Sequence, residues 1–491
     1  MQPAAPPFSR VSASTGASLT LGVIALLTAL RIALLVVSPL DLFVDEAQYW
    51  LWSTQPAAGY FSKPPLIAWL IALTAGLAGD AEWAVRLASP LLHAGTAGFV
   101  LLAGRALYDA RTGATAAIVY LTLPAVSFSS LLISTDAPLL FFWSAAFYAL
   151  IEAERRGGLW WPALGLTLGL GLLAKYAMAF FLIGWLGHAL SGGRTSRRGA
   201  ALALFVAGAC YAPNLVWNAV HHFVSYRHTG ADAELGGAGP HPGALLAFVA
   251  SQAALLGPGV FLGLLMALRP PADSRVRVLL WFTAPVLVFY LMLAAIAGAN
   301  ANWAASAYVA GAILAARGLL TCRWRPALRW ALALNVLLGL ALAGAVLRWG
   351  DDHARFPGQA DPFKRLRGWE ALGRQIAPWS QRYPADCLLV ADRATAAAMA
   401  YYAPPRPAPI VKWHPPGPIR DHFDLTADLA RANCPAWLLI GSPAQAATIL
   451  PHFAQVESLG GALQPQGGRA RIHALYRLQG FTGYPTRSDA R

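Results

Sequence analysis

The sequence predicts an α-helical polytopic membrane protein with about 11 transmembrane helices, additional interfacial helices and a small C-terminal α/β domain. Three observations lead to this fold class. The 491 residues are 57% hydrophobic and only 12% charged, whereas soluble proteins carry about 25% charged residues. Apolar stretches near the length that spans a bilayer as a helix recur along the chain. After residue 350 the sequence becomes polar and alternates short apolar runs with helical segments.

Twelve apolar segments are candidates for membrane helices. The first is too long for the core of a signal peptide and has no clear cleavage site, so it predicts an uncleaved helix. The segments cover residues 17–38, 64–79, 83–107, 112–132, 135–152, 159–174, 176–191, 200–217, 244–267, 277–297, 302–319 and 326–347.

Arginine-rich loops decide how many of these segments cross, because cytoplasmic loops carry an excess of Lys and Arg. Five such loops lie on the cytoplasmic side, opposite Asp45, only if one segment between Asp45 and Arg105 does not cross. Residues 64–79 are the best candidate, since they are short, begin with two prolines and contain two glycines. We therefore predict an interfacial or re-entrant helix there, eleven crossings and a cytoplasmic N-terminus. The five loops cover residues 105–111, 155–156, 194–198, 269–277 and 317–329.

This topology divides the chain into a transmembrane domain, residues 1–349 with a first outer loop at 39–82, and a periplasmic α/β domain, residues 350–491. In the second domain, Cys387–Val390 and Ala436–Ile440 are predicted strands, each followed by a helix. Cys387 and Cys434 could form a disulfide if this domain lies outside the cytoplasm, although sequence alone does not give their geometry.

The net charge of +14 raises the question of nucleic-acid binding. The arginines lie in short loops between apolar segments, where they orient the chain in the membrane, so we exclude a nucleic-acid partner. The sequence contains no GxGxxG motif, no P-loop, no CxxC pair and no internal repeat. It therefore predicts neither a nucleotide-binding domain nor a structural metal site.

The first outer loop holds the most distinctive group of polar residues. Asp45 and Glu46 directly follow the first membrane helix, where acidic side chains are costly unless they are solvated or paired. Tyr49 lies at helical spacing from this pair and would face headgroups or a sugar, and Tyr60 lies in the same loop. Lys63 precedes two prolines that hold it extended, so it is well placed to meet a lipid phosphate. The simpler interpretation is an aromatic belt with a solvated acidic cap and a snorkelling lysine.

Further polar residues fall on the same predicted face. Asp136 begins a membrane helix, and its simpler interpretation is an N-cap. The outer loops are otherwise poor in positive charge, yet several cations converge where the acids lie. Three of the histidines, at 221, 222 and 228, could ligate a metal, but their spacing matches no fixed pattern, so we predict no metal ligands. The predicted substrate-binding cations are Arg86, Lys175, His222, Arg227 and His228.

Together these residues predict group transfer from a lipid-linked phosphate donor. Cations bind a lipid phosphate, a carboxylate can act as general base on an acceptor hydroxyl, and aromatic rings can stack on a sugar.

The order of the motifs adds a family resemblance. The runs Asp45–Trp50, Gly59–Leu66, Arg86–Leu87 and Ser134–Ala137 resemble the bacterial branch of the protein-mannosyltransferase superfamily. These are membrane glycosyltransferases of the GT-C fold, and the aminoarabinose transferases that modify lipid A are in the same group. The resemblance covers about residues 20–320. Further matches are Gly171–Tyr176, Trp217–Asn218, His222–His228, Ala301–Trp303 and Ala307–Tyr308.

The resemblance implies a polyprenyl-phosphate sugar donor, inversion at the anomeric carbon and chemistry at the outer face of the bacterial inner membrane. It places the family's first-loop base on Asp45, its second acidic residue on Asp136 and its phosphate-contacting lysine on Lys63. Lys175, Arg227 and His228 are weaker assignments. The expected acceptor is a glycolipid, lipid A, a polysaccharide or a protein hydroxyl, and no cofactor is required.

Two positions depart from the aminoarabinose transferases. Those enzymes usually have Glu before the Lys-Pro-Pro motif, where this chain has Ser62, and Arg close to the acidic pair, where this chain has Gln48. Both departures weaken the case for aminoarabinose transfer to lipid A and for a bound metal.

Two other classes of function have to be weighed against an enzyme. A lipid-linked sugar transporter or flippase with a periplasmic binding domain would need polar residues through the middle of several helices. Here the helix interiors are Leu, Ala, Gly and Val, and the charges gather at one end. A non-catalytic assembly protein would leave the cluster around Asp45 and Lys63 unexplained.

Overall fold

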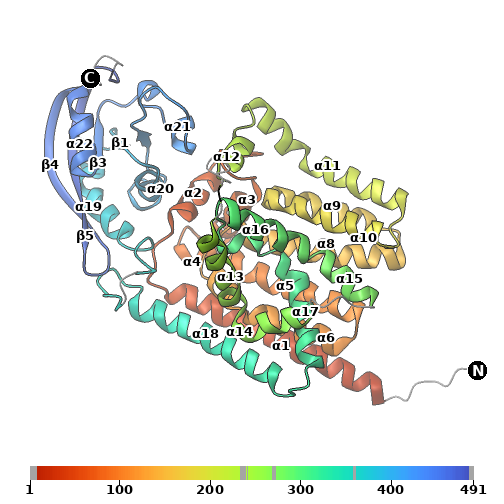
Figure 1. Ribbon diagram of the computed structural model, residues 1–491. Helices are drawn as coiled ribbons and strands as arrows, with labels where there is room; N and C mark the ends of the chain where they lie inside the picture. The colour runs from red at the N-terminus through yellow and green to blue at the C-terminus, as the bar shows by residue number, and fades with distance from the viewer. Residues whose placement is uncertain (1–7, 233–238, 240, 268–272, 358–360, 486–491) are drawn as a thin grey trace, which may run out of the picture. The chain divides into compact units, whose positions relative to one another are not determined.

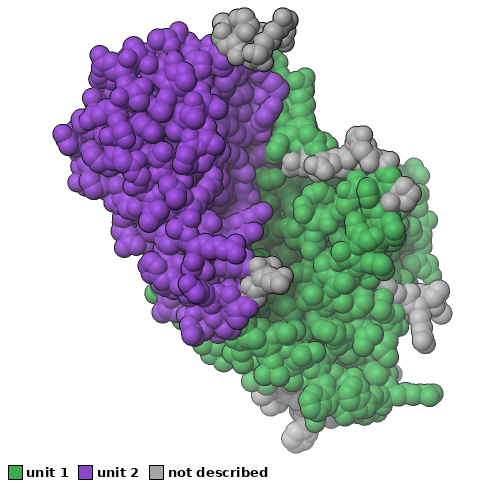
Figure 2. All heavy atoms as spheres, turned by 60° about the vertical axis from the view of Figure 1, so that its left-hand side comes forward, with its two compact units in different colours: residues 1–36, 63–67, 86–343 green, residues 37–62, 68–85, 344–491 purple. Residues whose placement is uncertain are grey.

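The computed structural model describes residues 8–232, 239, 241–267, 273–357 and 361–485 (Figure 1). Its residue contacts divide the chain into two compact units, which Figure 2 shows in different colours. The first unit consists of residues 1–36, 63–67 and 86–343. The second consists of residues 37–62, 68–85 and 344–491. The predicted domain boundary at residue 350 stays a prediction, and the contacts group most of the first outer loop with the C-terminal residues.

Helices account for the first unit. They are α1 (Phe8–Val37), α5 (Ala88–Leu107), α6 (Ala110–Thr122), α7 (Pro124–Ser129), α8 (Asp136–Arg156), α9 (Trp160–Ala174), η1 (Tyr176–Ala179), α10 (Phe180–Leu190), α11 (Arg197–Val220), α12 (Val224–Asp232), α13 (Pro242–Leu256), α14 (Pro258–Ala267), α15 (Ser274–Trp281), α16 (Ala284–Ile296), η3 (Ala301–Ala304), α17 (Ala307–Thr321) and α18 (Ala327–Trp349).

All twelve predicted apolar segments contain helix, as expected for a multi-pass membrane protein. Within the described residues, six helices are long and apolar enough to span a membrane. The pair α13 and α14, bent by 105°, raises the number to seven if it counts as one span. Four further apolar helices are shorter. The eleven crossings therefore stay a prediction, as does the non-crossing of α3 (Leu66–Ala78). At about 1.5 Å per residue, α3 is about 20 Å long, less than the roughly 30 Å of a bilayer core.

Glycine allows close helix contacts in the first unit. A Cβ at Gly165 of α9 would lie 2.4 Å from the carbonyl oxygen of Ala203 in α11. One at Gly104 of α5 would lie 2.8 Å from Cα of Gly113 in α6. Both are shorter than atoms can approach, so any side chain would push the helices apart. Close packing through small residues is the usual means of association between helices in lipid.

The five arginine-rich loops gather at one end of the first unit, as their charge predicted. Arg155, Arg194 and Arg275 line one pocket of about 670 Å³. The guanidinium groups of Arg275 and Arg317 both lie over the ring of Tyr108, at 5.6 and 5.2 Å from its centroid. These contacts bring together residues from all five loops, as a shared side requires, and the side of the membrane on which they lie stays a prediction.

The second unit contains a mixed five-stranded sheet in the order β2-β1-β3-β5-β4. Strand β1 lies between β2 and β3 and runs parallel to both, and the long β4–β5 hairpin continues the sheet antiparallel to β3. The elements of this unit are α2 (Val44–Ser53), α3, α4 (Glu82–Arg86), α19 (Trp369–Arg382), β1 (Cys387–Val390), α20 (Arg393–Tyr402), β2 (Ile410–Lys412), α21 (His422–Thr426), η4 (Leu429–Arg431), β3 (Trp437–Gly441), α22 (Pro443–Ile449), η5 (Leu450–His452), β4 (Phe453–Pro465) and β5 (Ala470–Phe481).

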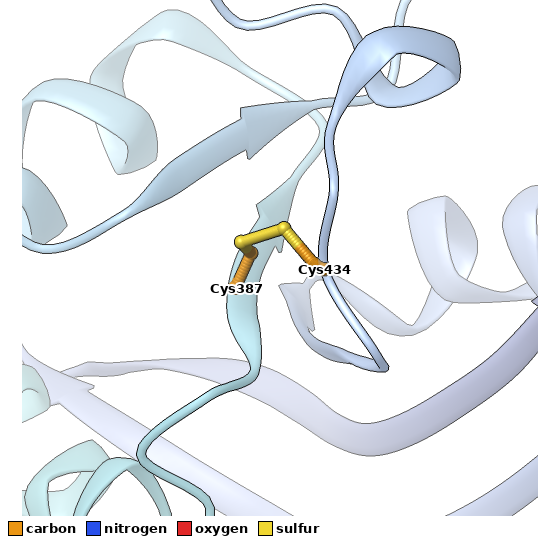
Figure 3. The surroundings of a disulfide bond; sticks show 2 residues. All are labelled: Cys387 and Cys434. Atoms are coloured by element: carbon orange, nitrogen blue, oxygen red, sulfur yellow. A yellow bond between two sulfur atoms is a disulfide. The ribbon is translucent and has the colours of Figure 1, made fainter.

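Both predicted strands and the helices after them are confirmed, because β1, α20, β3 and α22 fall where the sequence placed them. Every residue of β1 and β3 is buried, which explains their uninterrupted apolar sequence. Cys387 at the start of β1 forms a disulfide with Cys434, which precedes β3 (Figure 3). The parallel pairing of Cys387 with Trp437 brings the two cysteines into reach.

The outer-loop helix α2 packs on α20 within the second unit. The ring of Trp50 meets Tyr401 edge-on at 4.8 Å, and its indole nitrogen donates a hydrogen bond of 2.8 Å to Asp80. The backbone N–H of Leu42 donates to the hydroxyl of Tyr402 at 2.6 Å. The aromatic residues of the loop therefore anchor α2 to the C-terminal part of the chain.

Asp41, just before α2, is a buried carboxylate in this region. Its oxygen accepts the backbone N–H groups of Trp369, at 2.6 Å, and Glu370, at 3.3 Å. The pKa of Asp41 is raised to about 8, mainly by burial and also by the neighbouring acids Glu82 and Asp352, while the two N–H donors oppose the rise. Asp41 is therefore a group that binds its proton more tightly in the folded than in the unfolded chain.

This shift predicts a pH-dependent stability. A carboxyl group with a raised pKa contributes stability that is fully present below about pH 4 and lost as the pH rises through about 8. Asp41→Asn keeps an oxygen for Trp369 but removes the charge, so its melting temperature should fall less than that of the wild type between about pH 5 and about pH 9. Thermal unfolding in detergent measures this, with the exposed Glu457→Gln as control. Parallel curves for wild type and Asp41→Asn would contradict the assignment.

Candidate functional site

Asp45 lies in the first turn of α2, and its carboxylate forms an ion pair with the guanidinium of Arg393. The exposed fractions of the two side chains are 40% and 37%, so the pair is open to solvent. The Nε of Arg393 also donates a hydrogen bond of 2.7 Å to the side-chain oxygen of Gln48, one turn after Asp45. One guanidinium thus bridges two side chains on the same face of α2.

Three other predicted residues of this loop make contacts within it. Glu46 is buried, and its carboxylate accepts the backbone N–H of Phe43 at 2.8 Å, closing the start of α2. The Tyr60 ring stacks on Trp52 with 4.6 Å between centroids, and its hydroxyl donates to the Trp52 carbonyl at 2.9 Å. Tyr49 is buried beside the same Trp52. The substrate contacts predicted for Glu46, Tyr49 and Tyr60 stay predictions.

Asp136 begins α8 in the first unit, at the opposite end of that helix from Arg155 and Arg156. Lys175 reaches one carboxylate oxygen at 2.6 Å, and the side-chain amide of Asn302 donates to the other at 2.6 Å. The predicted convergence of Lys175 with Asp136 is therefore present. No side-chain cap forms at the start of α8, so the simpler interpretation of Asp136 as an N-cap does not hold.

Breaks in the helices position the two partners of Asp136. Lys175 is an extended residue, with φ −159° and ψ 136°, between α9 and η1. Asn302 lies in the short η3 turn, where the amide of the buried Gln252 donates to the Ala301 carbonyl at 3.1 Å. The polar Gln252 thus fixes the turn from within the helical core. The sequence alone does not mark Asn302 as a site residue, although it lies in the Ala301–Trp303 motif.

The predicted residues His222, Arg227 and His228 lie where α11 turns into α12. His222 and Phe223 both have a φ of 56°, in the left-handed region that non-glycine residues rarely adopt. Two successive residues of this kind cost free energy and are typical of functional segments. The turn brings the ring of Tyr226 to 4.9 Å from that of Tyr176, next to Lys175. The turn between α11 and α12 and the helix break at Lys175 are therefore neighbours.

The remaining predicted residues differ in burial. Arg227 is exposed, His228 and Lys63 are half-buried, and Arg86 at the end of α4 is 1% exposed. The described part of the chain contains no cluster of three or more His, Cys, Asp or Glu side chains that could hold a metal ion.

Besides Asn302, two residues that the sequence did not select become part of the candidate site. Arg393 is 348 positions from Asp45. The sequence around it predicts only the start of a helix in an α/β domain. Gln48 was recognised only as a departure from a family pattern. Their shared hydrogen bond shows that the departure at position 48 and the C-terminal arginine belong to one arrangement.

Comparisons with known proteins agree with this architecture. A family model described as dolichyl-phosphate-mannose-protein mannosyltransferase matches residues 62–217. The chain is 33% identical over 379 residues to the lipid A galacturonosyltransferase RgtD of Rhizobium johnstonii, covering 76% of this chain and 80% of that protein. It is 34% identical over 130 residues, about a quarter of each chain, to an undecaprenyl phosphate-α-4-amino-4-deoxy-L-arabinose arabinosyl transferase of Pseudomonas paraeruginosa.

A solved structure is similar along almost the whole chain. The ArnT protein of Cupriavidus metallidurans, in its complex with undecaprenyl phosphate, superposes with a TM-score of 0.69. The match covers 95% of this chain and 99% of that protein at 17% identity. This likeness shows the fold, including a C-terminal region after the helical part.

Proposed function

The chain belongs to the GT-C family of membrane glycosyltransferases, and from this premise we propose that it transfers a galacturonosyl group from a polyprenyl-phosphate carrier to a lipid A-type acceptor. The sugar is proposed because the relative named for galacturonosyl transfer to lipid A aligns with 76% of the chain, against 25% for the aminoarabinose transferase. The carrier is proposed from the printed names of the aminoarabinose relative and of the ArnT complex.

The reaction proposed is a single displacement. The acceptor hydroxyl oxygen forms a bond to the anomeric carbon while the bond from that carbon to the phosphate oxygen breaks. The electron pair of the broken bond leaves with the polyprenyl phosphate, and the acceptor's proton goes to the Asp45 carboxylate. Attack opposite the leaving group inverts the anomeric carbon. Lys63 and the other outer-loop cations stabilise the charge that develops on the departing phosphate.

The observation that carries this division of roles is the difference between the two carboxylates. Both oxygens of Asp136 are engaged, one by the Lys175 ammonium and one by the Asn302 amide, which suits a residue that positions other groups. Asp45 is paired with one guanidinium and is 40% exposed, which leaves room for an acceptor hydroxyl. We therefore propose Asp45 as general base and Asp136 as a positioning residue.

The proposed location is the bacterial inner membrane, with the C-terminal α/β region in the periplasm. The Cys387–Cys434 disulfide supports this side, because disulfides persist in oxidising compartments. The arginine-rich end of the first unit would then face the cytoplasm. Protease treatment of spheroplasts checks the location: the C-terminal region should be cleaved from outside. Cleavage only after lysis would place it in the cytoplasm.

The function is tested with purified protein in liposomes that contain lipid A. Undecaprenyl-phosphate galacturonic acid and undecaprenyl-phosphate aminoarabinose are supplied in parallel reactions, and mass spectrometry of lipid A identifies any added sugar. We expect a new glycosidic bond with the galacturonic acid donor only. Transfer of aminoarabinose would show that the proposed sugar is wrong. Movement of the donor across the bilayer without a new glycosidic bond would overturn the proposal that the protein is a transferase.

A further inference from the structure

Arg393 is the first residue of α20 and follows β1, the strand between β2 and β3 in the C-terminal sheet. The preceding Asp392 caps α20, accepting the backbone N–H of Thr395 at 2.9 Å. Its other oxygen accepts a hydrogen bond of 3.3 Å from the side-chain amide of Gln445 in α22. The backbone at Arg393 is therefore fixed from two sides, by β1 and by the helix after β3.

The strand order makes this position special within the second unit. The chain leaves β1 through α20 to reach β2 on one side, and later enters β3 on the other side of β1. In a doubly wound sheet this reversal leaves an opening at the carboxyl ends of the two strands, which is where such sheets bind ligands. Asp392 and Arg393 follow the carboxyl end of β1, and Ser442 follows that of β3.

In this protein α2 packs against α20 at that position, and Arg393 contacts it twice. Its Nε donates to Gln48 at 2.7 Å, and its terminal nitrogen pairs with Asp45. A guanidinium is planar and presents its donors in a fixed fork, so two contacts on neighbouring side chains define its orientation. They also define the orientation of the Asp45 carboxylate relative to α2.

We propose that Arg393 is a positioning residue for glycosyl transfer, supplied by the C-terminal part of the chain, that holds the Asp45 carboxylate in the orientation in which it accepts the acceptor's proton. The inference rests on the proposed role of Asp45. It gives the C-terminal α/β region a direct part in catalysis through the side chain it presents at the carboxyl end of β1.

A purely structural role for Arg393 is the competing explanation. The packing of α2 on α20 does not depend on it, because Trp50 contacts Tyr401 and Asp80, and Leu42 contacts Tyr402. An ion pair that is more than a third exposed on both sides contributes little to stability, since solvent screens it and the side chains lose entropy. The contacts of Arg393 are thus better suited to orientation than to holding the fold.

The test is steady-state kinetics of Arg393→Ala in the full-length protein, reconstituted with a lipid-phosphate donor. We expect kcat to fall about 10²-fold, the loss typical of a misplaced catalytic group, with the KM values for donor and acceptor nearly unchanged. Arg393→Lys should lose a similar factor, because an ammonium cannot bridge both side chains as a fork. Arg374→Ala, which removes an exposed arginine paired with Glu370 in α19, is the matched control and should turn over like the wild type.

Two rescues distinguish positioning from structure. Gln48→Arg in the Arg393→Ala background places a guanidinium one turn after Asp45 on the same helix, and guanidinium ion added to Arg393→Ala supplies the group from solution. Either addition should raise kcat at least tenfold above that of Arg393→Ala alone. Wild-type kcat in Arg393→Ala, or a loss that neither addition restores, would overturn the inference. Asp45→Asn separates the two ideas: if it is inactive while Arg393→Ala is normal, only Arg393 is wrongly assigned, and if it is active, the proposed base itself fails.

Discussion

Asp45→Asn should lower the turnover of sugar transfer by about 10³-fold, within the range of 10² to 10⁴ that general bases contribute. Asparagine has nearly the shape of aspartate, and its carbonyl oxygen can still accept the hydrogen bond from Arg393 that the ion pair provides in the wild type. The variant therefore keeps the local structure and loses the group that accepts a proton. The measurement is the initial rate of sugar transfer to lipid A in liposomes, with protein amount and disulfide content matched.

Asp80→Asn is the control for this experiment. Asp80 is an exposed carboxylate in the same outer loop, and an asparagine oxygen there can still accept from the Trp50 indole that contacts it. It should retain wild-type turnover. Equal, normal rates in both variants would remove Asp45 from the chemistry, whereas equal losses in both would point to damage of the loop rather than to a missing base.

The helical part of the fold was predictable because the thickness of the bilayer and the apolar composition of each segment determine where helices form, without long-range contacts. The break between α13 and α14 was not, since residues 244–267 read as one apolar segment. Gly257 has a φ of 77°, and Asn335 of α18 donates to the Leu256 carbonyl that the break exposes. A polar partner 79 residues away thus decides whether this segment is one helix or two.

The C-terminal sheet was predictable only where its strands are buried on both faces. The runs at β1 and β3 are continuous and apolar because every side chain is covered. Most residues of β4 are exposed, so its sequence has no comparable pattern, and the short β2 lies at the end of a proline-rich stretch. Pairing of β2 with β1 and of β4 with β5, rather than local composition, makes these segments strands.

The sequence predicted which candidate site residues lie on the same side of the membrane, but not which side chains contact each other. Charge on the loops placed Asp136 and Lys175 on one face, and the structure brings their side chains together. For Glu46 and Tyr60, the sequence could not distinguish structural contacts from substrate contacts. A carboxylate that accepts a hydrogen bond at a helix start and one that binds a sugar give the same sequence pattern. Arg393 could not be found, since its link to Asp45 depends on the packing of α2 against a helix more than 300 residues later.

Lys175→Met is expected to destabilise the protein by about 3 kcal/mol, at the low end of the cost of breaking a buried ion pair. The low end applies because the Lys175 side chain is 21% exposed, whereas that of Asp136 is 11% exposed. Methionine fills the volume of the lysine stem but leaves the Asp136 carboxylate with only the Asn302 amide. Thermal unfolding in detergent should show a clear fall in melting temperature, together with a large loss of turnover.

The double variant Lys175→Met/Asp136→Asn separates the structural from the catalytic part of this loss. Removing both charges eliminates the unpaired carboxylate, so the double variant should be more stable than Lys175→Met alone. Its turnover should stay low, because an amide at position 136 cannot hold a cation or acceptor in the way a carboxylate does. A double variant that recovered both stability and turnover would show that the ion pair serves only the fold, and Asp136 would then have no part in transfer.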